Sequence, residues 1–263
     1  MKRRLATIVL AVLWASPLLL LTMLSISRRW AWPHVWPTAW QWTQWAYFLR
    51  GRHALLFVFL MSVSISITVA VISTVLAFPT SRAIARHGGR SGWLALAHLP
   101  FAVSPVVLGV ALLYGFLRLG LAGHAVGVML AQSILAYAYG TILLHGFWSK
   151  RINAFAVLAE TLGATPWQRW SRVLVPIARP VLAICLFQTF LVSWFDFALV
   201  LLVGGGRVTT LTLQLYEYVR SGDIRLAATC ALLLAIPPLV VLAASYRVQR
   251  TVVATNVGGF DGR

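Results

Sequence analysis

Long apolar runs separated by short polar segments dominate this chain. A helix needs about 20 mostly apolar residues to cross the roughly 30 Å hydrocarbon core of a bilayer. The chain contains six runs of that kind, which predict six transmembrane helices. The predicted spans are Leu5–Ile26, Leu55–Phe78, Leu94–Leu117, Ala125–Phe147, Val181–Val203 and Ala227–Tyr246.

The lengths of these runs favour helices, because membrane β-strands would be about 10 residues long with strict alternation. One local exception is the alternation of hydroxyl and apolar residues at Ser62, Ser64, Ser66 and Thr68. These hydroxyls lie inside an apolar run that continues to Phe78, and backbone facing lipid must satisfy its own hydrogen bonds. We therefore interpret them as groups that pack one helix against another.

Composition agrees with a membrane protein. Hydrophobic residues make up 60% of the 263 positions and charged residues 10%, whereas a soluble domain carries roughly 25% charged residues. We expect an all-α membrane protein in which residues 1–263 form a single transmembrane domain. The net charge of +17 is spread over loops that face lipid headgroups, so we expect contact with lipid and none with nucleic acid.

Basic residues predict the orientation of the spans. If both termini are cytoplasmic, 14 of the 22 Lys and Arg residues fall on the inside, as the positive-inside rule requires. The basic start Lys2–Arg4 is followed by a run longer than the 7–15 residues of a signal peptide. This favours a first span that is not cleaved.

The first outer segment, Arg28–His53, is rich in tryptophan. Tryptophan prefers the level of the lipid headgroups, so the segment is interpreted as an interfacial anchor. The alternatives are a docking surface for an extracytoplasmic partner and, less favoured, an aromatic cage for a cationic ligand. The tryptophans are Trp30, Trp32, Trp36, Trp40, Trp42 and Trp45.

The cytoplasmic segment Lys150–Pro180 is too polar to span the membrane and longer than most connections. Its first half has apolar residues at helical spacing, and these are Ile152, Phe155, Leu158, Ala159 and Leu162. Gly163 fits the position after a helix end, where a positive φ is common.

A second helix is predicted to begin at Thr165, with Pro166 in its first turn. Pro176 and Pro180 are predicted to end it before the fifth span. The segment is thus a helix–turn–helix hairpin. It either docks a helix into a groove of a cytosolic partner or lies on the membrane surface.

The sequence LGATPWQRWSRVLVPIARP within this hairpin resembles the "EAA" loop of permease subunits of ATP-binding-cassette (ABC) importers. The resemblance assigns contact with the ATPase to Val157, Leu158, Ala159, Leu162, Gly163, Ala164, Pro166, Trp167 and Pro176. One departure is that Val157 stands where the family has its glutamate, and Glu160 is three positions too late. The resemblance therefore implies a more apolar coupling contact here.

The resemblance extends to the six-span layout and to TLTLQLYEYVRSGDIRLAA after the fifth span. It implies the type I (MetI-like) importer fold in a bacterial inner-membrane protein. The implied partners are a cytoplasmic ATPase dimer, a second permease subunit (a different chain or a second copy) and an extracytoplasmic solute-binding protein. Permeases of this type move polyamines, thiamine, ferric iron, phosphonates or oxyanions, and the solute stays open.

Asp196 is the one acidic residue inside a predicted span. Such residues face the bundle interior or a water-filled path, so it is a candidate for the substrate pathway or gate. The alternative is a packing residue that caps a kink or pairs with a backbone donor. Gln188 lies about 80° away on the same broad helix face, and we hypothesise that both residues line the pathway.

The outer segment Gly204–Leu226 has a glycine break followed by an amphipathic stretch. Tyr216, Glu217, Arg220 and Asp223 in that stretch are candidates for contact with the binding protein. The alternative is a plain interfacial loop.

The energy source is expected to lie outside this chain. No G-x-x-x-x-G-K-[ST] phosphate loop is present, and neither of the two lysines follows a glycine. We therefore predict that the chain is not an enzyme and holds no cofactor. His98 and His145 lack the spacing of metal ligands, so we predict no metal. An ion-coupled secondary transporter that uses Asp196 as its coupling carboxylate remains the alternative.

Overall fold

The computed structural model describes residues 2–28, 30, 36–37, 39–49, 55–86 and 92–258. Apart from an isolated antiparallel bridge between Ser27 and Trp40, the regular structure of this part of the chain is helical. The chain divides into two compact units. Unit 1 is Met1–Phe59 with Gln214–Arg263, and unit 2 is Leu60–Leu213.

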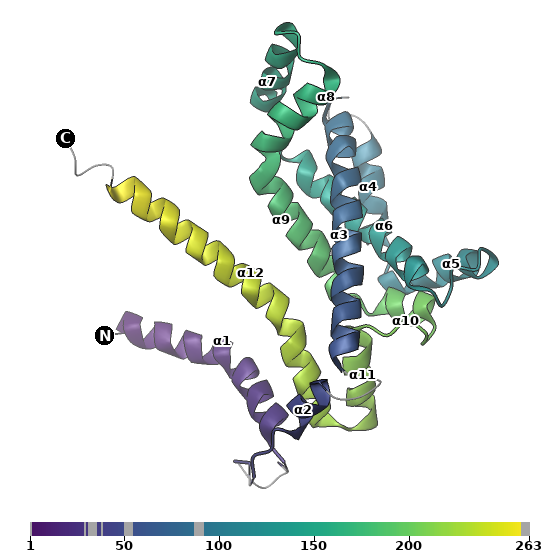
Figure 1. The fold of residues 1–263 in the computed structure, drawn as a ribbon, viewed down its shortest axis with the longest axis vertical. Coiled ribbons are helices and arrows are strands. Elements are labelled where there is room, and N and C mark those ends of the chain that lie inside the picture. The colour runs from purple at the N-terminus through teal and green to yellow at the C-terminus, as the bar shows by residue number, and fades with distance from the viewer. Residues whose placement is uncertain are drawn as a thin grey trace. The chain divides into compact units, whose positions relative to one another are not determined.

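Unit 1 consists of two long helices and one short helix. They are α1 (Lys2–Ile26), α2 (Thr43–Leu49) and α12 (Ile224–Gly258). α1 packs along α12 (Figure 1). After α1 the chain turns back on itself, and the Arg28 N–H donates to the Ala39 carbonyl at 2.9 Å. The Arg225 guanidinium donates to the Arg28 carbonyl at 2.9 Å and so ties this turn to α12.

The remaining elements lie wholly or partly in unit 2, which begins within α3 at Leu60 and ends within α11 at Leu213. They are α3 (Leu55–Arg86), α4 (Gly92–Ala102), α5 (Pro105–Arg118), α6 (Ala125–His145), α7 (Lys150–Thr161), α8 (Pro166–Gln168), the π-helix η1 (Arg169–Leu174), α9 (Val175–Trp194), α10 (Ala198–Gly204) and α11 (Leu211–Ser221). Figure 1 shows α7 at one end of this unit and α10 towards the other.

Small residues let α3, α6 and α9 approach closely at the centre of unit 2. A Cβ added at Gly140 of α6 would lie 3.2 Å from the Ala77 Cβ and 3.2 Å from the Cys185 Sγ. Beside them, the hydroxyls of Thr74 and Thr189 lie 3.2 Å apart. Close backbone approach at small residues, with hydroxyls bonded across helices, is typical of helix packing in membranes.

The alternating hydroxyls of α3 have two different roles. The Leu211 N–H donates to Ser62 Oγ at 2.7 Å, and Ser66 Oγ lies 3.2 Å from Ser193 Oγ. The predicted helix-packing role is therefore confirmed for Ser62 and Ser66. The hydroxyls of Ser64 and Thr68 bond instead to carbonyls of their own helix, so for these two residues the role stays a prediction.

Four described helical segments are long and apolar enough to cross a membrane. They are α3, α6, Pro166–Trp194 and Ile224–Val241. α4 and α5 together form a fifth candidate that is bent by 95°. In α1, among the side chains that the structure describes, a shorter apolar segment runs over Ala15–Ile26. An all-helical membrane protein is thus confirmed, whereas the count of six spans is not.

Two predicted spans are not single helices. Leu94–Leu117 bends before Pro105, where Ser104 is extended with φ −59° and ψ 140°. The ring of a proline disfavours helical geometry in the residue before it, and this explains the bend. Val181–Val203 is interrupted between α9 and α10.

The close packing at Gly140 predicts a selective loss of stability. Gly140→Val forces apart α3, α6 and α9, and overpacking of this kind costs about 1–3 kcal/mol. Gly115→Val in α5 is the matched control, because nothing lies within 4 Å of an added Cβ there. The measurement is the thermal midpoint of each detergent-purified variant, taken from the loss of monodisperse protein with rising temperature. Equal midpoints for the two variants would contradict the packing described here.

Candidate functional site

The predicted hairpin forms, and capping interactions fix its two helices. Ser149 Oγ accepts a hydrogen bond from the Ile152 N–H at the start of α7. Gly163 follows α7 with φ +80°, as predicted for a residue after a helix end. Thr165 Oγ1 accepts from the Gln168 N–H at 3.3 Å, and Gln168 Oε1 accepts from the Thr165 N–H at 3.0 Å. This capping box starts α8 where the sequence predicts it.

The two prolines after the hairpin do not end the second helix, contrary to the prediction. The helix runs through Pro176 and Pro180 and continues to Trp194. Immediately before Pro176 the chain forms a π-helical turn, in which the Val175 N–H bonds to the Trp170 carbonyl five residues earlier. A wider turn relieves the clash that a proline ring makes with the preceding turn of an α-helix.

Large apolar side chains at the hairpin are exposed. The exposed fraction is 57% for Val157, 55% for Leu158, 79% for Leu162 and 78% for Trp167. We call these four residues, together with the exposed Phe155, the hairpin apolar surface. Contiguous exposed apolar residues mark sites of contact with another protein or with a membrane.

A hollow of about 660 Å³ lies along α7 within this surface. It is lined by Arg151, Ala154, Phe155, Val157, Leu158 and Thr161. The other predicted coupling residues differ in burial. Gly163 and Pro166 are exposed, with Pro166 in the first turn of α8 as predicted, whereas Ala159, Ala164 and Pro176 are partly buried.

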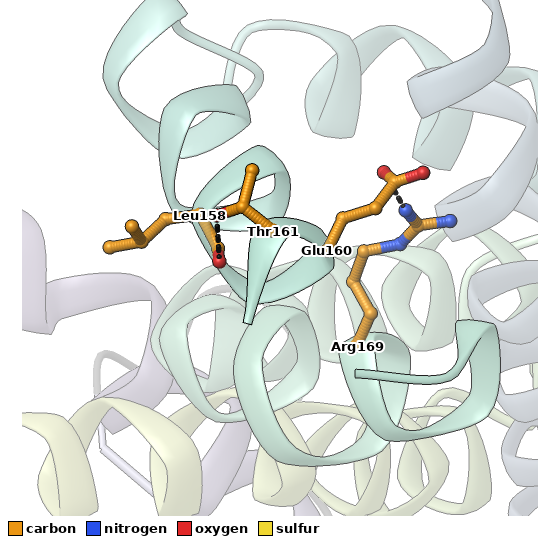
Figure 2. A network of polar contacts seen from close by, with 4 residues as sticks. All are labelled: Leu158, Glu160, Thr161 and Arg169. Carbon is orange, nitrogen blue, oxygen red and sulfur yellow. Dashed lines mark hydrogen bonds and ion pairs between the residues drawn. The ribbon is translucent and has the colours of Figure 1, made fainter. Parts of the chain in front are cut away.

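An ion pair closes the hairpin. Arg169 of η1 donates to the Glu160 carboxylate at the end of α7, and Figure 2 shows the two side chains pointing toward one another. Figure 2 also shows the Leu158 side chain extending to the other side of α7, where its carbonyl accepts from Thr161 Oγ1 at 2.8 Å. Glu160 is 64% exposed, so the pair contributes about 1 kcal/mol or less. Its carboxylate is engaged within the hairpin.

The base of the hairpin is buried against the bundle. Ala156 of α7 is 1% exposed and Leu174 of η1 is fully buried, and both pack in one cluster with Leu144 of α6 and Ala178 of α9. The hairpin therefore presents one apolar face outward and buries another, which makes it a firmly seated projection of unit 2.

The second candidate site is the break between α9 and α10, where Asp196 lies. Its carboxylate accepts hydrogen bonds from the Leu199 N–H at 3.5 Å and the Val200 N–H at 3.3 Å. These are free N–H groups of the first turn of α10, where a negative charge is favourable. The carboxylate thus supplies partners for the broken backbone, which explains why the predicted continuous span is wrong here.

A buried chain of polar side chains continues from Asp196 across three helices. Gln132 of α6 donates to Asp196 Oδ2 at 3.0 Å, and Ser193 Oγ donates to Gln132 Oε1 at 2.7 Å. Ser193 Oγ in turn lies 3.2 Å from Ser66 Oγ on α3. Gln132 is 1% exposed. Sequence reasoning missed it, although a lone amide inside a predicted span is a signal of the same kind as Asp196.

Asp196 also faces a hollow of about 470 Å³. The hollow is lined by Pro100, Phe101, Val103, Pro105, Leu135, Leu191, Val192, Phe195, Asp196, Phe197 and Ala198. Gln188 is partly buried in α9 and is not among these residues. The structure therefore places Asp196, but not Gln188, at this hollow.

The predicted outer contact residues lie in unit 1, at the end of α11 and just after it. Tyr216, Glu217 and Arg220 are exposed on α11. Asp223 follows the helix and accepts a hydrogen bond from the Leu226 N–H at 3.2 Å, so it caps α12. A hollow of about 540 Å³ beside it is lined by Leu24, Ser27, Arg28, Trp30, Ser221, Gly222, Asp223, Ile224 and Arg225.

Comparison with known proteins gives a consistent result. No family model matches the chain. The molybdenum transport system permease protein ModB of Mycobacterium tuberculosis is 32% identical over 206 residues, which cover 72% of this chain and 78% of ModB. The maltose/maltodextrin transport system permease protein MalG of Yersinia pestis is 30% identical over 131 residues, which cover 48% of this chain and 42% of MalG.

The fold has a counterpart among solved structures. A bacterial ABC transporter that imports the acidic polysaccharide alginate matches with a TM-score of 0.67, at 15% identity and with 94% of each chain covered. This likeness supports the predicted type I importer fold, and the sequence relatives are transport permeases rather than enzymes. The chain therefore belongs to the family of membrane-spanning permease subunits of ABC importers.

Proposed function

We propose that this permease subunit moves an oxyanion, with molybdate as the first candidate, across the bacterial inner membrane. The support for this solute is the similarity to ModB, which covers more than two thirds of both chains. Polyamine, thiamine, ferric iron and phosphonate are the other classes of solute considered from the sequence. The similarity to MalG covers less than half of either chain and carries less weight.

The hairpin apolar surface is the proposed contact for a cytoplasmic ATPase dimer. Its exposed aliphatic and aromatic side chains and the hollow along α7 suit helix-in-groove docking. Valine rather than glutamate at position 157 makes this contact more apolar. The hairpin and both termini are proposed to lie on the cytoplasmic side. The support is the distribution of basic residues along the sequence.

Two further partners complete the proposed importer. A second permease subunit, a different chain or a second copy, is needed to enclose a pathway. On the outer side, Tyr216, Glu217, Arg220 and Asp223 are the proposed contacts for a solute-binding protein. The support for the outer contact is the exposure of the three α11 side chains.

Asp196 and Gln188 are proposed to act on the solute pathway in different ways. Asp196 faces a hollow and holds the break between α9 and α10, which suits a gate. For Gln188 the support is only its position in α9, eight residues earlier. The alternative is an ion-coupled secondary transporter with Asp196 as coupling carboxylate. It is not favoured, because the relatives are permease subunits of molybdenum and maltose/maltodextrin transport systems.

Solute identity is tested by uptake into proteoliposomes that contain the complete complex, its binding protein and internal ATP. We expect ATP-dependent accumulation of molybdate, with competition by other tetrahedral oxyanions. Spermidine, thiamine, ferric iron, a phosphonate and maltose serve as alternative solutes. ATP-dependent uptake of one of these without uptake of molybdate would reject the proposed solute.

Docking of the ATPase is tested by crosslinking. Trp167→Cys is expected to crosslink to a cysteine in the groove of the co-expressed ATPase, because Trp167 is 78% exposed at the hairpin. Tyr216→Cys is a matched control, since it is also an exposed aromatic residue but is proposed to lie on the outer side. A crosslink from Tyr216→Cys, or none from Trp167→Cys in an intact complex, would count against the proposal.

The gate is tested by Asp196→Ala. This change removes the acceptor of two N–H groups of α10 and the shorter of the two hydrogen bonds that the Gln132 amide donates. Each buried group left unsatisfied costs about 1–3 kcal/mol. We expect uptake per assembled complex to fall by about tenfold, which corresponds to about 1.4 kcal/mol of that loss acting on the barrier of the transport step. Ser64→Ala, which removes an exposed hydroxyl outside the network, should have no effect. Unchanged uptake and assembly for Asp196→Ala would exclude the role.

A further inference from the structure

Arg82 of α3 is a buried cation that the proposed transport mechanism has not used. It is 2% exposed, and its guanidinium carbon lies 5.5 Å from the ring centroid of Trp148 and 4.9 Å from that of Trp170. Its Nε and Nη2 atoms are buried without a hydrogen-bond partner among the described residues. The ion pair found in this part of the chain joins Glu160 to Arg169. Among the residues that the structure describes, Arg82 is therefore held by two aromatic rings and forms no ion pair with a carboxylate.

Neighbouring residues of α3 hold the same two tryptophans. The Phe78 ring stacks on Trp148 with centroids 5.2 Å apart, and meets the Trp170 ring edge-on, also at 5.2 Å. Trp148 Nε1 donates to Ser81 Oγ at 2.9 Å. We call Phe78, Ser81, Arg82, Trp148 and Trp170 the Arg82 cluster. It joins one turn of α3 to two other segments of the chain.

Those two segments are the two ends of the hairpin. Trp148 precedes the Ser149 cap of α7, and Trp170 lies in η1, after α8. Both ends are thus attached to the same turn of α3, and the Glu160–Arg169 pair closes the hairpin between them. A displacement of the hairpin cannot leave α3 in place without separating Arg82 from at least one ring.

An apolar side chain would fill this space at lower cost than a cation. Burying a charge carries a large desolvation penalty, and a well-packed apolar replacement is often neutral or stabilising. Within the described part of the chain, Arg86 and Arg169 repel Arg82 and Glu160 attracts it. Packing alone therefore gives no reason for an arginine. Stacking on a planar guanidinium is directional. An arginine at position 82 is therefore explained if the two rings must keep one orientation relative to α3.

We propose that Arg82 is a positioning residue that locks both ends of the hairpin to α3, so that a nucleotide-driven displacement of the hairpin moves α3 as part of the same rigid body. This inference rests on the proposed docking of an ATPase on the hairpin. It assigns to the cytoplasmic end of α3 a part in coupling for which the hairpin sequence alone gives no signal.

The test measures the distance between two spin labels in the purified permease–ATPase complex. The labels are placed at Arg86→Cys on α3 and Ser171→Cys on η1, both exposed positions, with Cys185 and Cys230 replaced by alanine. Each complex is measured without nucleotide and after trapping with ATP and vanadate. With Arg82 present, the distance is expected to be the same in both states.

Arg82→Gln is expected to free the hairpin, so that trapping shifts the distance by about one helical turn, ~5 Å. Arg82→Lys keeps the charge but not the planar stacking, and should shift by an intermediate amount. The matched control is Arg179→Gln, which neutralises an exposed arginine of α9 and should behave like the parent protein. If Arg82→Gln does not assemble, the inference is decided by the distance shift in Arg82→Lys.

A shift in the parent protein on trapping, or no shift in the assembled Arg82 variants, would overturn the inference. Copurification of the ATPase in the same samples keeps the two proposals apart. Loss of copurification with the parent chain means that the proposed docking fails, and this inference fails with it. If the ATPase copurifies but the distance is the same whichever residue stands at position 82, this inference is rejected and the proposed docking stands.

Discussion

Polar groups inside an apolar helical bundle must find partners within the protein, and unit 2 is organised by this constraint. The break between α9 and α10 exposes N–H groups that have no partner in their own helix. Asp196 supplies the acceptor, and Gln132, Ser193 and Ser66 then satisfy the carboxylate and one another. A hydrogen bond to a charged group contributes about 1.5–3 kcal/mol, so the network offsets much of the cost of burying it. One carboxylate thereby connects α3, α6, α9 and α10.

The hairpin shows the opposite arrangement, since it keeps large apolar side chains exposed while its base is buried against the bundle. Its capping interactions at Ser149 and Thr165 are local and fix the turn independently of any partner. The buried Ala156 and Leu174 seat the base, while Leu162 and Trp167 remain outside. An exposed apolar surface on a firmly held support loses little conformational entropy on docking, which suits a contact made repeatedly in a transport cycle.

The sequence predicts most of this architecture where the signal is local. Run length identifies the apolar helices, and Gly163 and Thr165 mark the hairpin turn, because each depends on a few neighbouring residues. The breaks are harder to foresee. Asp196 stands out as a charge in a span, but its partner Gln132 lies 64 positions away in sequence. The helix continues through Pro176 because of a π-helical turn, and no single residue type predicts such a turn. Burial of Arg82 likewise depends on tertiary packing, since an arginine after a span ordinarily indicates an exposed cytoplasmic end.

The two candidate sites lie at the ends of one helix. From Pro166 the chain is helical through η1 and α9 to Trp194, which at about 1.5 Å per residue corresponds to a length on the order of 40 Å. The hairpin begins this helix, and the Asp196 break ends it. A packed helix with continuous backbone bonds resists bending more than the break at Phe195–Phe197 does. At the break the Phe195 N–H still bonds to the Leu191 carbonyl at 3.1 Å, but the Asp196 N–H bonds only to the Ser193 carbonyl three residues back, at 3.2 Å. The π-helical turn and the Asp196 break are therefore the two positions along this path where the backbone departs from α-helical geometry, one beside each site.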